Sequence, residues 1–143
     1  MVEISCDLYK GKKLTQLCKS LNIQDEIFFA GVQSFPHDYY PLFDVFVFPS
    51  ISEGLGTVFY EAMHHSVPVI CSDIRPFSNY ITHGYNGLLF KPGSVDDLLE
   101  KMILMYQNTF LRNKIRFNGY DLAKKHFDYE ILMGKLFHAI TGE

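Results

Sequence analysis

The chain has 143 residues, of which 48% are hydrophobic and 20% are charged, and its formal net charge is −3. A chain of this length and composition can bury a sizeable core, so we expect residues 1–143 to form a single globular domain. The small negative charge and the lack of a long basic run argue against nucleic acid as a partner.

The cysteines and the apolar runs exclude several other classes. Cys6, Cys18 and Cys71 are widely spaced and form no C-x-x-C pair, so we expect reduced thiols in a cytoplasmic protein rather than a zinc or redox site. The longest apolar runs are only strand-sized, and the N-terminus lacks the basic and apolar segments of a signal peptide. We therefore predict neither a membrane span nor a secretion signal, while attachment to a membrane surface stays open.

Five short apolar runs predict strands along the first two thirds of the chain. Their residues are VEISC at 2–6, EIFFA at 26–30, DVFVF at 44–48, VPVIC at 67–71 and GLLF at 87–90. Continuous apolar character is typical of strands that are covered on both faces. Apolar residues at helical spacing lie between the runs, namely Leu14, Leu17, Cys18 and Leu21, then Val58, Phe59, Ala62 and Met63. Alternating strands and helices predict an α/β fold with a parallel sheet of about five strands.

The last third of the chain shows helical spacing only. We expect one helix over residues 96–107, a second over residues 109–126 and a third after Phe127. The Pro-Gly-Ser stretch at 92–94 supplies a turn and an N-cap for the first of these helices.

The stretch SEGLGTVFYE at 52–61 is the strongest site candidate. It follows the third predicted strand, and ligands of open α/β sheets bind beyond the carboxyl ends of the strands. Gly54 and Gly56 let the backbone approach a ligand closely, and the amides at the start of the following helix favour phosphate. Glu53 and Glu61 flank these glycines, although carboxylates repel phosphate.

A ligand with a phosphate part and a polyol part resolves this conflict, because ionised carboxylates accept hydrogen bonds from sugar hydroxyls. A nucleotide sugar is such a ligand, with Glu53 and Glu61 reaching different parts of it. Two alternatives stay open: a dipole-complementing Glu53 with a solvated Glu61 and a simple glycine turn, or an acid and nucleophile pair of the glycosidase type. On spacing alone the first alternative is as well supported as the nucleotide sugar, because a Gly-x-Gly pair is a weak signal.

Four further polar residues are weaker candidates. The adjacent His64 and His65 point about 100° apart on a helix, so we interpret them as helix-end histidines rather than as ligands of one metal. Asp73 and Arg75 follow the fourth predicted strand at the ligand edge of the sheet. A loop charge or a cap is the preferred interpretation of both.

Two segments lie beside the second and third strands. Tyr39, Tyr40 and Phe43 have helical spacing before the third strand, and we interpret them as core rather than as a platform for a base. Gly31 and Val32 follow the second strand at the ligand edge, where a base could lie against the backbone.

Four stretches between Gln24 and Asp97 occur in a characteristic order and separation. They are IFFAGV at 27–32, DVFVFPSISEGLGTVFYEAM at 44–63, PVICSDI at 68–74 and HGYNGLLFKPGSVDDL at 83–98. In these stretches the chain resembles the nucleotide-sugar-dependent glycosyltransferases of the GT-B fold, of the retaining E-x7-E type. FDYE at 127–130 also resembles the aromatic start of that family's closing helix. The resemblance implies a Rossmann-like doubly wound sheet with extra C-terminal helices, which is half of a GT-B fold.

The resemblance also implies a donor-binding set. Its residues are Gly31, Val32, Glu53, Gly54, Leu55, Gly56, Thr57 and Glu61. Glu53 would be the catalytic-site residue that binds hydroxyls of the donor sugar, and the backbone at 54–57 would bind that sugar and the diphosphate. Glu61 would bind the ribose hydroxyls, and the loop at 31–32 would hold the base.

The reaction implied by the resemblance is a retaining transfer of the hexosyltransferase type. A glycosyl group would move from a UDP-sugar or GDP-sugar to a glycan, lipid or similar acceptor of unknown identity. No cofactor and no obligatory metal are expected, because the departing diphosphate is stabilised electrostatically while the acceptor attacks the same face of the sugar. Peripheral membrane association of the full-length enzyme and homo-oligomerisation of this chain stay open.

The chain also departs from the family pattern. We find neither the N-terminal acceptor domain nor the arginine and lysine that precede the donor site, so we expect a truncated donor half with little transferase activity alone. Ser66 replaces a usual glycine, and Asn79 replaces a common glutamate. The alternative is an inactive nucleotide-sugar-binding or protein-interaction module whose missing half is supplied in trans or lost. An aromatic content of 15% is compatible with an exposed apolar face on such a module.

Overall fold

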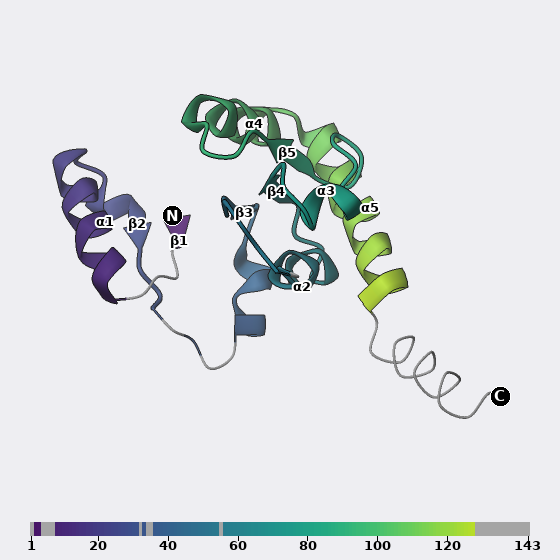
Figure 1. The fold of residues 1–143 in the computed structure, drawn as a ribbon, viewed down its shortest axis with the longest axis horizontal. Coiled ribbons are helices and arrows are strands. Elements are labelled where there is room, and N and C mark those ends of the chain that lie inside the picture. Colours follow the sequence, from purple (N-terminus) through teal and green to yellow (C-terminus); the bar gives the residue numbers. More distant parts are fainter. Residues whose placement is uncertain (1, 4–7, 32, 34–35, 55, 128–143) are drawn as a thin grey trace. The chain divides into compact units, whose positions relative to one another are not determined.

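The computed structural model of the chain describes residues 2–3, 8–31, 33, 36–54 and 56–127 (Figure 1). They belong to two compact units, Met1–Pro36 and His37–Glu143. The helix expected after Phe127 lies outside the described residues, and the single domain expected over 1–143 stays a prediction.

The described residues of the first unit form a pair of parallel strands, an α-helix and a 3-10 turn. Strand β1 (Val2–Glu3) pairs with strand β2 (Ile27–Phe28). Helix α1 (Leu8–Ser20) and the 3-10 turn η1 (Gln24–Glu26) connect the two strands. Strand, helix and strand follow in the predicted order, although the described strands are shorter than the apolar runs that predicted them.

The second unit contains a three-stranded parallel sheet in the order β3-β4-β5. Its strands are β3 (Phe46–Phe48), β4 (Val69–Ser72) and β5 (Leu88–Phe90). Its helices and 3-10 turns are η3 (Tyr40–Leu42), α2 (Val58–His64), α3 (Phe77–Tyr80), α4 (Val95–Gln107) and α5 (Thr109–Phe127). The 3-10 turn η2 (Pro36–Asp38) lies at the boundary of the two units in the sequence. The α/β fold with parallel strands is therefore confirmed. The single sheet of about five strands is not: the described strands form a two-stranded sheet in the first unit and a three-stranded sheet in the second, because the runs of apolar residues locate strands but not their pairing.

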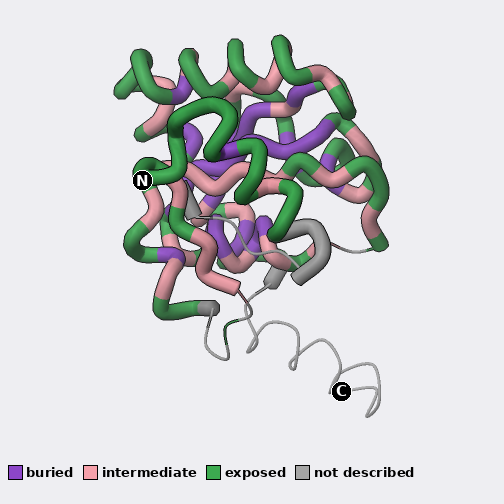
Figure 2. Tube along the Cα trace, turned by 90° about the vertical axis from the view of Figure 1, so that its left-hand side faces the viewer, coloured by how far each residue is buried: buried purple, intermediate pink, exposed green. Residues whose placement is uncertain are grey.

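Strand β4 is the centre of the second unit, and all four of its residues are 0% exposed. Val69 and Cys71 pack into one apolar cluster with residues of α2 such as Phe59. Ile70 packs into a second cluster with residues of α4 and α5 such as Met105. Figure 2 colours the buried residues purple and the exposed residues green. Because both faces of the strand are covered, its sequence is apolar without alternation.

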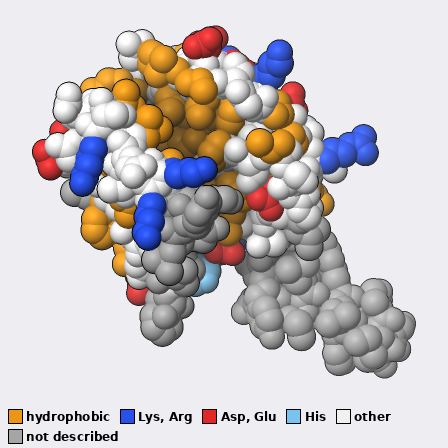
Figure 3. Space-filling model, turned by 60° about the vertical axis from the view of Figure 1, so that its left-hand side comes forward, with side chains coloured by type: hydrophobic (Ala, Val, Ile, Leu, Met, Phe, Trp, Pro, Cys, Tyr) orange, Lys and Arg blue, Asp and Glu red, His pale blue; other side chains and the backbone are white. Residues whose placement is uncertain are grey.

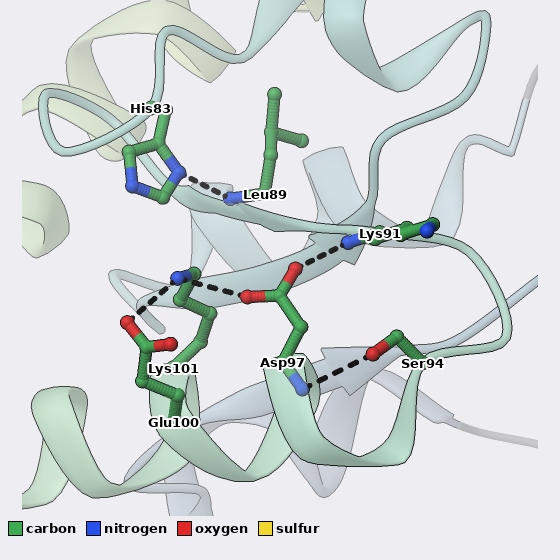
Figure 4. Close-up of polar contacts among 7 residues, drawn as sticks. All are labelled: His83, Leu89, Lys91, Ser94, Asp97, Glu100 and Lys101. Carbon is green, nitrogen blue, oxygen red and sulfur yellow. Dashed lines mark hydrogen bonds and ion pairs between the residues drawn. The ribbon is translucent and has the colours of Figure 1, made fainter.

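Hydrogen bonds between side chains and backbone fix the segment from β5 to α4 (Figure 4). The Nδ1 atom of His83 accepts a hydrogen bond from the N–H of Leu89 at 3.0 Å. The N–H of Lys91 donates to Oδ2 of Asp97 at 2.6 Å, and this bond holds the pKa of Asp97 below its usual value. The N–H of Asp97 donates to Oγ of Ser94 at 3.3 Å, so Ser94 is the N-cap that the sequence predicts.

Apolar side chains also lie at the surface (Figure 3). Tyr106 and Phe110 are each 82% exposed and Phe117 is 73% exposed, and all three belong to α4 or α5. Cys18 and Cys71 are free thiols, and burial raises the pKa of the Cys71 thiol. A buried thiol of raised pKa, such as that of Cys71, is a poor nucleophile. Cys6 lies outside the described residues, and the reduced state of the three thiols stays a prediction.

Helices α1 and α2 end in the same way. Each is followed by a residue of positive φ, Asn22 at 54° and Ser66 at 60°. After Ser66, the N–H of Val67 donates to the carbonyl of Ala62 at 2.9 Å, which is the long bond of a Schellman motif. Glycine is the usual residue at this position, because other side chains pay a steric cost there. The steric cost is a physical reason for the glycine that the resemblance leads us to expect at position 66.

We expect Ser66→Gly to raise the free energy of unfolding by about 1 kcal/mol, because glycine removes the steric cost of the left-handed conformation. Asn22→Gly is the matched control at the end of α1. It should change the stability less, since asparagine tolerates this conformation. Urea denaturation of the two variants measures both effects, and a Ser66→Gly chain no more stable than the parent would contradict the prediction.

Candidate functional site

The candidate site is the loop at residues 49–57, between strand β3 and helix α2. Strand β3 ends at Phe48, so the loop leaves the carboxyl end of a parallel strand, as predicted. Thr57 occupies the N-cap position of α2, and its side chain makes no capping hydrogen bond. Leu55 lies outside the described residues.

Gly56 is required by two features of the loop. Its φ is +58°, and a Cβ on it would lie 2.6 Å from Cε1 of Phe77. Phe77 is 0% exposed, and its ring packs against the rings of Phe48 and Phe59 at centroid distances of 5.0 and 5.3 Å. By contrast, a Cβ on Gly54 would meet no atom within 4 Å. Gly56 therefore serves the packing of the loop, while Gly54 faces open space.

Glu53 is held inside the loop by a neighbouring hydroxyl. The Oγ atom of Ser50 donates a hydrogen bond to Oε1 of Glu53 at 2.6 Å, and the pair is partly buried. Among the described residues no donor to Oε2 of Glu53 occurs. The described hydrogen bond to the carboxylate thus comes from Ser50 rather than from an amide of α2.

Glu61 is held by a residue from a distant part of the sequence. The hydroxyl of Tyr40, in turn η3, donates to Oε2 of Glu61 at 2.9 Å. Tyr40 is 5% exposed, so its interpretation as a core residue is confirmed. Burial and the hydrogen bond to the Glu61 carboxylate both raise the pKa of the Tyr40 phenol, which keeps it a donor at physiological pH. Glu61 is partly buried and hydrogen-bonded, so it is not the fully solvated residue of the alternative interpretation.

His65 lies against the ring of Tyr40. The two rings are stacked, with centroids 5.4 Å apart and an interplanar angle of 21°. Burial lowers the pKa of His65, and the nearby imidazoles of His64 and His37 lower it further. His64 is the last residue of α2 and His65 its C-cap, so the interpretation as helix-end histidines is confirmed. At neutral pH the ring beside Tyr40 is therefore uncharged.

The remaining predicted residues are less informative. Gly31 follows β2 in the first unit with a φ of +66°, and Val32 lies outside the described residues. The role of these two residues beside a nucleotide base stays a prediction. Asp73 and Arg75 are exposed, and the N–H of Asp73 donates to the carbonyl of Phe90 at 2.7 Å. The described contact of Asp73 is thus made by its backbone.

No cluster of three or more His, Cys, Asp or Glu side chains in the described ranges could hold a metal ion. None of the helices described is both long and apolar enough to cross a bilayer.

Sequence reasoning missed two hydroxyl groups of the site. Ser50 lies three residues before Glu53, a spacing at which side chains of one loop often meet, so a local signal was present. Tyr40 lies 21 residues before Glu61, and no local pattern joins them. The tyrosine was recognised as core, but its hydroxyl was not linked to the site.

A parallel α/β sheet with helices that follow its strands places the chain in the Rossmann-like class, in which ligands bind beyond the carboxyl ends of the strands. Residues 9–122 match the family described as Glycosyl transferases group 1, so the chain belongs to that family. It is 38% identical over 88 residues to the uncharacterized glycosyltransferase MJ1178 of Methanocaldococcus jannaschii, a match that covers 62% of this chain and 25% of that protein. It is 30% identical over 125 residues to the lipopolysaccharide core biosynthesis mannosyltransferase LpsB of Rhizobium meliloti, covering 82% of this chain and 34% of that protein.

Solved structures share the fold. Anabaena Alr3699/HepE, in complex with UDP and glucose, aligns with a TM-score of 0.87 at 22% identity, covering 97% of this chain and 39% of that one. The C-terminal domain of the glycosyl transferase group 1 family protein LpcC from Francisella tularensis aligns with a TM-score of 0.77 at 30% identity. The alignment covers 86% of this chain and 65% of that one. The GT-B type of fold is thus confirmed. The chain spans between 25% and 34% of the two curated relatives named above.

We expect Gly56→Ala to lower the free energy of unfolding by about 2 kcal/mol or more, because it combines a left-handed backbone with a clash against a packed phenylalanine ring. Gly54→Ala should stay within about 0.5 kcal/mol of the parent, since its new methyl group meets open space. Urea denaturation compares this matched pair. Equal stability of the two variants is the outcome that contradicts the assignment.

The pKa of His65 predicts a dependence of stability on pH. Because folding lowers this pKa below its ordinary value of 6.5, the unfolded chain binds more protons in the window just below 6.5. Stability should therefore fall as the pH drops from about 7 toward about 5. His65→Phe keeps a stacked ring without titration, so its loss over this window should be smaller. NMR titration of the imidazole gives the direct check, and a His65 pKa at or above 6.5 would refute the expectation.

Proposed function

We propose that this chain binds a nucleoside diphosphate sugar, as the donor half of a retaining glycosyltransferase of the E-x7-E type. Glu53 binds hydroxyls of the donor sugar, the backbone at 54–57 binds the diphosphate, and Glu61 binds the ribose. One observation carries the proposal: both glutamates are held by hydroxyl donors, Ser50 and Tyr40, through one carboxylate oxygen each. The second oxygen of each carboxylate then accepts hydrogen bonds from the ligand.

The loop between the two glutamates supports the assignment of different residues to the sugar, the diphosphate and the ribose. Open space next to Gly54 gives room for a ligand to approach the backbone. Glu61 lies four residues after Thr57, which corresponds to about 6 Å along a helix at ~1.5 Å per residue. The carboxylate on the ribose is thereby separated from the phosphate-binding backbone, which limits the repulsion between the two negative groups.

The comparisons also support the proposal. A structure with the same fold, that of Anabaena HepE, is a complex with UDP and glucose. We propose the same kind of donor for this chain, in a reaction that stabilises the departing diphosphate electrostatically, without cofactor or obligatory metal, and retains the configuration of the sugar. The cytoplasmic location expected from the thiols is part of the same proposal.

The chain covers only part of its relatives, so activity and acceptor are proposals for the whole protein. We expect little transferase activity from these 143 residues alone, because transfer requires the closure of two domains around donor and acceptor. The second candidate function is a non-catalytic module that pairs with another chain. The exposed aromatic residues Tyr106, Phe110 and Phe117 favour it.

Titration of the chain with UDP, GDP and ADP by calorimetry tests the proposal. At least one of these nucleotides should bind at millimolar concentration or below. Glu61→Ala should weaken that binding about tenfold or more, because the ribose hydroxyls lose a charged acceptor.

Two variants serve as controls for this titration. Glu100→Ala removes an exposed glutamate of α4 that pairs with Lys101, so it should leave the affinity unchanged. Glu53→Ala should weaken the binding of the sugar nucleotide more than that of the nucleoside diphosphate alone. If no nucleotide binds at millimolar concentration, the proposal is wrong and the non-catalytic module is favoured.

A further inference from the structure

The contact between Tyr40 and Glu61 joins two separate segments of the second unit. Tyr40 belongs to turn η3, before strand β3, and Glu61 belongs to helix α2, after that strand. The phenol oxygen and Oε2 of the carboxylate are 2.9 Å apart. The hydrogen bond thus fixes the end of a flexible side chain from outside its own helix.

The Tyr40 ring is itself held on several sides. The imidazole of His65 stacks on it with centroids 5.4 Å apart. The rings of Phe43 and Phe46 meet it edge to face, at 6.1 and 6.0 Å and interplanar angles of 88° and 70°. Because Tyr40 is also 5% exposed, its hydroxyl has a position set by core packing rather than by solvent.

The chemistry of the pair leaves Glu61 able to bind a ligand. A carboxylate offers about four acceptor positions on two oxygens, and the phenol occupies one of them. No donor to Oε1 of Glu61 occurs among the described residues. A ribose presents two adjacent hydroxyl donors, which a carboxylate of fixed orientation can accept together. A freely rotating glutamate would first have to lose its rotamer freedom, which weakens binding.

We propose that Tyr40 is a positioning residue that orients the Glu61 carboxylate toward the two ribose hydroxyls of the nucleotide. This inference rests on the proposed function, because it concerns the same donor site. It adds a residue from the apolar core to the ribose-binding part of that site. Tyr40 acts through Glu61 and makes no contact with the ligand itself.

The test is Tyr40→Phe, which keeps the ring and removes only the hydroxyl. The probes are the nucleotide that the parent chain binds most tightly among UDP, GDP and ADP, and the 2′,3′-dideoxy form of that nucleotide. Tyr40→Phe should weaken the ribonucleotide about threefold to tenfold and leave the dideoxy form unchanged. In the Glu61→Ala background the same substitution should have no further effect, since its partner is gone. Tyr39→Phe, at the neighbouring position, is the control and should bind like the parent.

A second measurement needs no variant and therefore does not depend on the folding of Tyr40→Phe. The NMR signal of the Tyr40 ring carbon Cζ reports on the hydroxyl of the parent chain. It should shift when the ribonucleotide is added, and it should not shift when the dideoxy form is added at equal occupancy.

The outcomes separate this inference from the proposed function. If the parent and Tyr40→Phe bind the ribonucleotide with equal affinity, the inference alone is overturned. It is also overturned if Tyr40→Phe loses the same factor in affinity for the ribonucleotide and for the dideoxy form, because that result would indicate a purely structural tyrosine. An unmoved Cζ signal at saturation also overturns it. A parent chain that binds none of the three nucleotides overturns both the inference and the proposed function.

Discussion

The burial of strand β4 on both faces is the constraint on which the second unit depends. Three of its residues pair with β3 on one side and three with β5 on the other, and the side chains of Val69, Ile70 and Cys71 enter two separate apolar clusters. If the pairing of β4 with its neighbours shifted by one residue, each side chain of β4 would point to the opposite face of the sheet and leave the cluster in which it packs. The register of the sheet is therefore set by the core. Because the strands are parallel, this register also fixes the edge from which the loop at residues 49–57 leaves the sheet.

One of the two clusters is shared by the core and the candidate site. Phe77 lies in it and fills the space beside Gly56, and Tyr40 lies in it and holds Glu61. The packed interior has little freedom to relax. The position of Phe77 therefore restricts the loop at Gly56, and the position of Tyr40 restricts the Glu61 side chain on helix α2. The glutamates are thus placed by groups of different origin. Glu53 depends on its own loop through Ser50, whereas Glu61 depends on the tertiary packing around Tyr40.

Local patterns in the sequence were sufficient for much of the fold and part of the site. The apolar runs located the strands, the spacing of apolar residues located α4 and α5, and Ser94 was recognised as a cap. The loop of the site was found because it follows a strand and contains glycines. The difference between Gly54 and Gly56 was not predictable, since it depends on a phenylalanine from another element. The bond between Tyr40 and Glu61 was hidden for the same reason, because it arises only when the sheet brings η3 and α2 together.

The type of side chain that donates a hydrogen bond to Glu61 has a consequence for the proposed site. A lysine or arginine in the place of Tyr40 would compensate the negative charge of the carboxylate, and an arginine could occupy both of its oxygens. A phenol supplies one hydrogen bond and no charge, and the neighbouring His65 is neutral because burial lowers its pKa. Among the described residues, these side chains therefore add no positive charge beside the carboxylate and donate to one of its oxygens. Hydroxyl donors of a ribose are stronger partners for such a charged acceptor than for a neutral one. A buried tyrosine next to an uncharged imidazole is thus suited to preparing a glutamate for a diol, whereas a cation would compete with that diol.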